Sequence, residues 1–347
     1  MKKIQLIVIL ITLFTFASAS LMAVEDISFG SSGGQFKKVG AAGGQFLKIG
    51  PGGRANGMAG AYGAVANDLT AIYWNPSGLA DVKDMAGAFS YTQWFAGFSH
   101  SFAAISLPLG ENFTTAVSLT SFGSDDIPVT TIEFPDGTGN TYRYNDIAVG
   151  FTFSGYLTDQ FSFGVTAKYI SSALASLHSS GFAFDVGTMY ATGIQGIKLG
   201  FSIHNLGTEQ EFSGVDLNAT KKFIEELYSA PIDVKYVASP YNIPLIFRAG
   251  LSSDLMDTEE HKLIAAFDFV TLSDTPEQFA LGAEYTWNSF LSVRAGYRMG
   301  SDQLGFGGGI GLKYTGGGFS GQLDYAINPT ANLGLINRLS LAVTFGD

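Results

Sequence analysis

The sequence contains no cysteine, so it can form neither a disulfide nor a thiolate metal site, and it offers no cysteine nucleophile. Its four histidines stand far apart and give none of the spacings typical of metal ligands: His100, His178, His204 and His261. We therefore expect no metal site, no metal-dependent catalysis and no cofactor.

Charged residues are also scarce. They make up 14% of the 347 residues, about half of the share that a soluble domain usually carries. The formal net charge is −11, and no cluster of Lys and Arg is present. Binding to phosphates requires such clusters, which excludes nucleic acid as a partner. The low share of charged residues indicates that little of the protein surface faces water.

Long apolar runs are missing after the first residues. Lys2 and Lys3 precede an apolar run at residues 4–16, and small residues follow at Ala19 and Ala23. This pattern predicts a signal peptide over residues 1–23, cleaved after one of these alanines. No later segment has the roughly 18 consecutive apolar residues of a membrane-spanning helix. A membrane-embedded structure must therefore consist of strands.

What the sequence does have is glycine, aromatic residues and alternation. It holds 44 Gly, 29 Phe and 15 Tyr. From residue 85 onward, stretches of roughly ten residues alternate large apolar side chains with small or polar ones, as at residues 161–169 and 279–287. About fourteen such stretches occur. They begin near Met85, Phe98, Phe113, Tyr144, Gln160, Ser179, Ile197, Ile243, His261, Pro276, Phe290, Leu304, Gly318 and Ile336. The pattern predicts an all-β protein, a transmembrane antiparallel β-barrel over residues 85–347.

The breaks between these stretches alternate in length. Short breaks, such as residues 110–112 and 193–196, contrast with long ones at residues 123–143 and 207–242. In bacterial barrels short turns face the periplasm and long loops face outside. The runner-up fold is an exported soluble β-sandwich, whose outward residues should be polar. Here the second face carries Gly, Ala, Ser, Thr and isolated charges, which suits a narrow, plugged interior.

Eight charged residues of the C-terminal half fall on the face opposite the large apolar residues. A charge facing lipid costs ~2–4 kcal/mol at the bilayer midplane, so these side chains should point inward. They form either a polar path that anchors a ligand or an ion-pair network that holds a plug to the wall, and their alternating signs favour the network. The eight are Arg248, Asp268, Glu284, Arg294, Arg298, Lys313, Asp324 and Arg338.

The long break at residues 207–242 contains apolar residues at helical spacing, followed by Pro231. A short amphipathic helix is predicted over residues 220–228. It would act as a lid and partner-binding surface, or would pack its apolar face over the barrel mouth. The residues of this face are Phe223, Ile224, Leu227 and Tyr228.

No catalytic residue is predicted. Residues 30–34 match G-x-S-x-G, but they lie in a glycine-rich leader without a preceding strand. Residues 316–321 match G-x-G-x-x-G within a predicted turn between strands, where no phosphate-binding helix can begin. Both matches are therefore coincidental, and a non-enzymatic protein is expected.

Residues 50–80 show no strand alternation. Their small residues favour a short helix or turn compact enough to fit inside a barrel, ended by a turn at Asn75 and Pro76. A buried Arg54 would need an acidic partner, with Asp185, Asp268, Glu284 and Asp324 as candidates. The characteristic residues are Arg54, Gly57, Met58, Gly60, Asn75, Pro76, Gly78 and Leu79.

In this motif, in its predicted signal peptide and in the regular spacing of its predicted strands, the whole chain resembles the PorV/PorQ family, a branch of the FadL-like outer-membrane barrels. FadL-like relatives commonly carry Ala where this chain has Ser77. The resemblance implies a fourteen-stranded barrel in the bacterial outer membrane, with residues 24–84 entering the lumen as a plug or hatch. The motif is shared by barrels with different functions, so it supports the fold better than the function.

The family suggests two functions. The first, favoured by aromatic residues in the long loops, is a type IX secretion component that handles cargo for export and surface attachment. The second is a FadL-like channel for hydrophobic small molecules such as fatty acids, and a sealed scaffold is a third. Expected partners are outer-membrane lipid, the barrel assembly machinery, secreted cargo proteins and secretion-system subunits.

Overall fold

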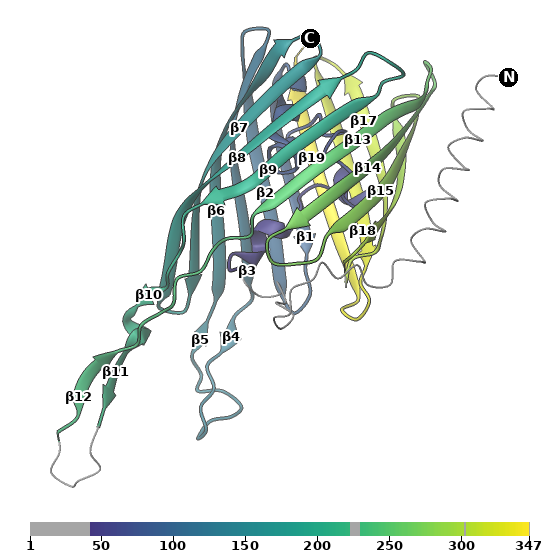
Figure 1. The fold of residues 1–347 in the computed structure, drawn as a ribbon. Coiled ribbons are helices and arrows are strands. Elements are labelled where there is room, and N and C mark those ends of the chain that lie inside the picture. The colour runs from purple at the N-terminus through teal and green to yellow at the C-terminus, as the bar shows by residue number, and fades with distance from the viewer. Residues whose placement is uncertain (1–41, 223–229, 302, 347) are drawn as a thin grey trace, which may run out of the picture. The chain divides into compact units, whose positions relative to one another are not determined.

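A computed structural model describes residues 42–222, 230–301 and 303–346 of the chain. The predicted signal peptide and residues 24–41 lie outside the described residues. A closed barrel of 14 antiparallel strands dominates the structure (Figure 1). Its strands are β1 (Met85–Gln93), β2 (Phe98–Leu109), β3 (Phe113–Ser124), β6 (Tyr144–Thr158), β7 (Phe161–Leu174), β8 (Leu177–Ala191), β9 (Lys198–Gly207), β13 (Ile246–Asp257), β14 (His261–Leu272), β15 (Gln278–Trp287), β16 (Leu291–Met299), β17 (Phe306–Gly316), β18 (Phe319–Pro329) and β19 (Leu335–Phe345).

The barrel confirms the predicted fold, and each predicted strand start lies within three residues of the observed one. Each strand pairs with its neighbours in the chain, and β1 pairs with β19 to close the circle. The sandwich alternative is wrong because the sheet closes on itself. No helix among the described residues is both long and apolar enough to cross a bilayer.

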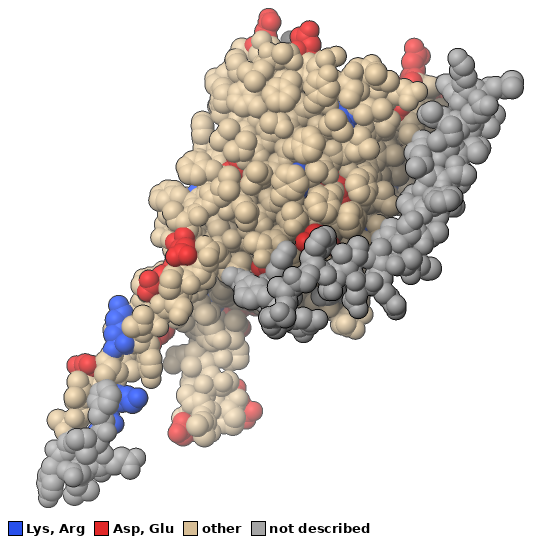
Figure 2. All heavy atoms as spheres, in the orientation of Figure 1, with Lys and Arg blue, Asp and Glu red and all other residues tan. Residues whose placement is uncertain are grey.

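The two faces of the strands differ as the alternation predicts. On β7, Val165 and Tyr169 are exposed, whereas Thr166 and Ile170, each the next residue along the strand, are buried. The visible outer wall is mostly free of charged atoms, which gather at its ends and on two protruding hairpins (Figure 2). The exposed apolar side chains thus form an exterior suited to lipid, whereas the interior is packed with both polar and apolar side chains.

A charge in the middle of this exterior should destabilise the barrel. Phe151 lies near the centre of β6 and is 55% exposed, whereas Leu157 near its end is 63% exposed. We expect Phe151→Arg to lower the free energy of unfolding by ~2–4 kcal/mol and Leu157→Arg by ~0–1 kcal/mol, because the cost depends on depth. Urea unfolding in lipid vesicles measures both. Equal costs would contradict a membrane-spanning β6.

Residues 42–84, the luminal segment, fold as short helices instead of strands. They are η1 (Gln45–Lys48), α2 (Gly53–Gly57), α3 (Ala71–Trp74) and η2 (Pro76–Asp81). Helix η2 contacts β6, β7 and β8, whereas α2 contacts β16 to β19 on another arc of the barrel. The segment therefore lies within the barrel, between its walls (Figure 1).

The two ends of the barrel differ. Short turns join β2 to β3, β6 to β7, β8 to β9 and β15 to β16 at the short-turn end. The long-loop end carries two hairpins, one of β4 (Ile127–Pro128) and β5 (Thr141–Tyr142), and one of β11 (Asn218–Lys221) and β12 (Ile232–Lys235) (Figure 1). β10 (Ser213–Gly214) and η3 (Val215–Leu217) precede β11. At the base of the first hairpin, hydrogen bonds from Arg143 lower the pKa of Asp126.

The helix predicted over residues 220–228 is wrong at its start. Thr220 and Lys221 belong to β11, where backbone pairing with Asp233 and Ile232 replaces helical hydrogen bonds. The local apolar spacing could not reveal this partner strand, which begins at Ile232, eleven residues after the end of β11. The predicted apolar face, Phe223, Ile224, Leu227 and Tyr228, lies outside the described residues.

Candidate functional site

Arg54 joins the luminal segment to the wall through a buried ion-pair network. Its Nε and Nη2 donate to the two carboxylate oxygens of Glu284, both at 2.8 Å. Glu284 also accepts from Nε of Arg294 at 2.5 Å, and Nη1 of Arg294 donates to Asp324 at 2.6 Å. Two guanidinium groups thus face two carboxylates. Of the four candidate partners of Arg54, the structure pairs it with Glu284.

Asp324 belongs to the same network through Arg294, whereas the other two candidates bind elsewhere. Asp185 pairs with Lys168 at 2.8 Å and faces His204 at 3.3 Å. Asp268 accepts the backbone N–H groups of Tyr62 and Gly63 at 3.2 and 2.7 Å. Sequence reasoning did not group Lys168, Asp185 and His204, because they stand on three different strands and only the barrel places them together.

Asn75 joins two helices of the luminal segment. It ends α3, and its side-chain oxygen accepts from the backbone N–H and the hydroxyl of Ser77 at 3.3 and 2.8 Å. Pro76 occupies the first turn of η2, where its missing N–H costs no hydrogen bond. The predicted terminating turn is therefore also the beginning of a 3₁₀ helix. Gly164 and Gly187 of the wall lie so close to this corner that a Cβ would stand 2.3 and 2.2 Å from Pro76 and Asn75.

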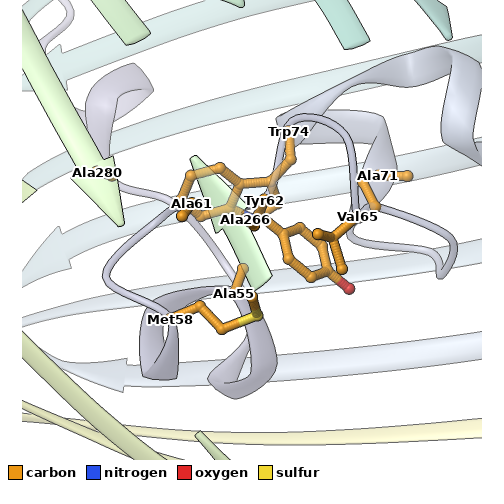
Figure 3. Packing of buried hydrophobic residues seen from close by; sticks show 10 residues of the cluster. Ala55, Met58, Ala61, Tyr62, Val65, Ala71, Trp74, Ala266 and Ala280 are labelled. Atoms are coloured by element: carbon orange, nitrogen blue, oxygen red, sulfur yellow. The ribbon is translucent and has the colours of Figure 1, made fainter. Parts of the chain in front are cut away.

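The other motif residues fill the lumen. Met58, Tyr62 and Trp74 pack with small residues of the luminal segment and with Ala266 and Ala280 of the wall (Figure 3). Leu79 lies in a second apolar cluster with Phe102 of β2. The glycines of the motif permit close approach of the backbone. A Cβ at Gly57 would contact Gly309, and a Cβ at Gly60 would collide with Arg298. A Cβ at Gly78 would collide with the carbonyl oxygen of Ala66.

The eight predicted inward charges divide into groups. Glu284, Arg294 and Asp324 form the network with Arg54. Arg248 and Arg298 donate to backbone oxygens of the luminal segment, Asp268 accepts from its N–H groups, and Arg338 donates to Asn328. Lys313 is exposed and lines a cavity at the short-turn end.

Three cavities adjoin along β1 and β19. A cavity of about 620 Å³ opens beside Asp68, Leu69 and Gln322. These residues also line a cavity of about 30 Å³ inside the wall. That small cavity shares Phe89 and Leu341 with an apolar groove of about 500 Å³ on the outer surface. The sequence carried one signal for the groove, the small Gly87 among large outward residues.

Solved structures with the same architecture include transporters. TbuX, described as a toluene transporter of Ralstonia pickettii, matches with a TM-score of 0.57 at 11% identity, over 86% of this chain and 99% of its own. CymD, described as a monoaromatic hydrocarbon channel, matches at 0.56 and 12% identity, over 86% of this chain and 98% of its own. A FadL homologue of Pseudomonas aeruginosa matches with a TM-score of 0.53 at 12% identity, over 85% of this chain and 98% of its own. No protein-family model and no curated protein sequence matches the chain.

The fold and the apolar exterior define a transmembrane β-barrel of the outer-membrane type. Within that class, the chain shares its fold with these channels and with the FadL homologue.

Proposed function

We propose that this protein is an outer-membrane channel for hydrophobic small molecules, with the luminal segment as the hatch that limits access. Aromatic hydrocarbons and fatty acids are the candidate substrates, because the similar structures include hydrocarbon channels and a FadL homologue. Of the two functions that the family resemblance suggested, the comparisons favour this one. The finer PorV/PorQ assignment stays a hypothesis.

The observation that carries the proposal is the row of cavities at β1 and β19. The small luminal cavity is separated from the outer groove by Ala88, Phe89 and Leu341, which line both. The groove has an apolar lining that suits a hydrophobic molecule on its way into the bilayer. Nine residue pairs hold β1 against β19, so passage requires these strands to separate locally.

Filling the groove should slow uptake. Gly87 faces the groove, and a Cβ there would have no neighbour within 4 Å. Gly321 is the matched control, because it also has free space and, like Gly87, stands opposite Val343, but it does not line the groove. We expect Gly87→Trp to reduce uptake of the neutral fluorophore N-phenyl-1-naphthylamine by cells several-fold, and Gly321→Trp to leave it unchanged.

The comparison requires equal amounts of heat-modifiable barrel in the outer membrane. If cells with the parent protein take up no more fluorophore than cells that lack the protein, the proposed channel function is contradicted. Equal uptake by parent and Gly87→Trp would contradict the route past β1.

A second candidate function, handling of secreted cargo, is favoured by one observation. Two loops at the long-loop end carry a highly exposed apolar residue each, Ile132 between β4 and β5 at 97% exposure and Val237 just after β12 at 91%. Such residues suit contact with a protein partner. Binding of a purified cargo C-terminal domain to the parent, lost on deletion of residues 209–241, would support this function. Unchanged binding after that deletion would count against it.

A further inference from the structure

Three arginines from separate strands line one small cavity at the long-loop end of the lumen. Arg248 comes from β13, Arg298 from β16 and Arg338 from β19, and the cavity has a volume of about 50 Å³. Arg248 and Arg338 are only 5% and 2% exposed. Lys48 of the luminal segment and Trp94 of the β1–β2 loop complete this part of the wall.

Within the part of the chain that the structure describes, these positive charges lack matching acids. Among the described residues, no carboxylate lines the cavity and none of the three arginines forms an ion pair. Lys48 is bound by Asp274 at 3.0 Å. Asp268 is the acid that interacts electrostatically with Arg248 and Arg298. Three guanidinium charges against the single charge of an ionised Asp268 still leave an excess of two.

The contrast with the Arg54 network is direct. There, two arginines meet two carboxylates within hydrogen-bonding distance. Buried charges are unfavourable unless they are paired and hydrogen-bonded. The luminal arginines receive only partial compensation, from the ring faces of Tyr73 and Trp74 at 5.0 and 5.1 Å from Arg248, and of Trp94 at 5.8 Å from Arg338.

Several buried nitrogen atoms around the cavity also lack a hydrogen-bond partner among the described residues. Arg248 directs its Nη atoms to the backbone and hydroxyl oxygens of Tyr73, and Arg338 directs Nη1 to Asn328. The Nε atoms of both arginines are buried and have no partner among the described residues. The same holds for both ring nitrogens of His100, which stands next to Arg338 across β1. Buried unpaired donors are rare, so several of them around one charge point to an absent acceptor.

We propose that this cavity binds one oxyanion, held by the guanidinium groups of Arg248, Arg298 and Arg338. The ligand chemistry is that of a carboxylate or phosphate oxygen, the preferred acceptor for arginine. It can come from a free anion or from the charged head of an amphiphile, whose tail would contact Trp74, Ile246 and Leu272 in the lining. Only the amphiphile source rests on the proposed function.

Tryptophan fluorescence provides a direct test, because two of the three tryptophans, Trp74 and Trp94, line the cavity. The purified barrel in a neutral maltoside detergent is titrated with phosphate, acetate, decanoate and decanol at constant ionic strength. We expect a saturable change in fluorescence and a rise in the unfolding temperature with at least one oxyanion. Saturation with phosphate or acetate identifies a free anion, and saturation with decanoate alone identifies a charged head group.

Two other outcomes would overturn the site. In the first, no oxyanion gives a saturable response. In the second, decanol binds as well as decanoate, which would show that binding rests on apolar contacts alone. That result would leave the proposed function intact. A bound anion without any uptake of hydrophobic compounds would instead retain the site and remove the proposed function.

Variants separate specific binding from general charge effects. Arg248→Gln and Arg338→Gln should each weaken oxyanion binding by about tenfold or more, because a charge-assisted hydrogen bond is lost. Arg143→Gln is the control, since Arg143 lies in the exposed loop and 67% of its side chain is exposed. If the Gln variants do not fold, Arg248→Lys and Arg338→Lys retain the charge and should weaken binding by losing the planar donor group. Unchanged affinity in all folded variants would refute the site.

Discussion

Replacing Glu284 with Gln will loosen the luminal segment and lower the stability of the whole barrel. Glu284 is 3% exposed and accepts from both Arg54 and Arg294. Removing one member of a buried ion pair leaves an uncompensated charge and costs about 3–5 kcal/mol. Arg294 retains Asp324, whereas Arg54 loses its two shortest contacts to an acid. We therefore expect the largest change at Arg54.

Limited proteolysis of the assembled barrel measures this change as new cleavage between residues 42 and 84. The double variant Arg54→Gln, Glu284→Gln should recover part of the lost stability, because it removes the charges from both partners. Asp126→Asn is the matched control, since its ion pair with Arg143 is solvent-exposed and contributes little. A Glu284→Gln protein as protease-resistant as the parent would refute the anchoring role of Glu284.

Replacing Gly164 with Leu will displace the luminal segment and open the barrel to small solutes. A Cβ at Gly164 would stand 2.3 Å from the backbone carbon and oxygen of Pro76. Backbone atoms cannot rotate away as a side chain can, so the cost exceeds the ~1–3 kcal/mol typical of overpacking. The corner held by Asn75 and Pro76 must therefore leave its place against β7.

Ion conductance of single barrels in planar bilayers measures the opening. We expect rare openings in the parent and frequent ones in Gly164→Leu. Gly321→Leu should behave as the parent, because nothing lies within 4 Å of a Cβ there. Gly164→Ala gives a milder test, since its Cβ alone already collides. Parental conductance in both Gly164 variants would contradict the close packing of η2 on β7.

The family resemblance was informative at the level of the barrel. The structural comparisons support the FadL-like fold that the Asn75-Pro76 motif implied. The channel that we propose differs from secretion, the function that the aromatic residues of the loops had favoured. The reason is that the motif belongs to the packing of the lumen, whereas function depends on cavities and loops that the motif does not encode.

The sequence by itself determined the strands and their faces. Alternation along a strand is a local property with a period of two, so residues such as Val165 and Thr166 reveal their faces without knowledge of any partner. The inward position of Glu284 and Arg338 followed from the same parity.

Only the tertiary structure decided which inward groups meet. Arg54 and Glu284 are 230 residues apart in the chain, and the path of the luminal segment through the barrel places them together. The same closure of the barrel places Arg248, Arg298 and Arg338 around one cavity that none of the described acidic residues lines. The alternation along a strand assigns a side chain to the lumen. Its position along the barrel axis and its partner depend on the strand register and on the luminal segment, and no local sequence pattern specifies either.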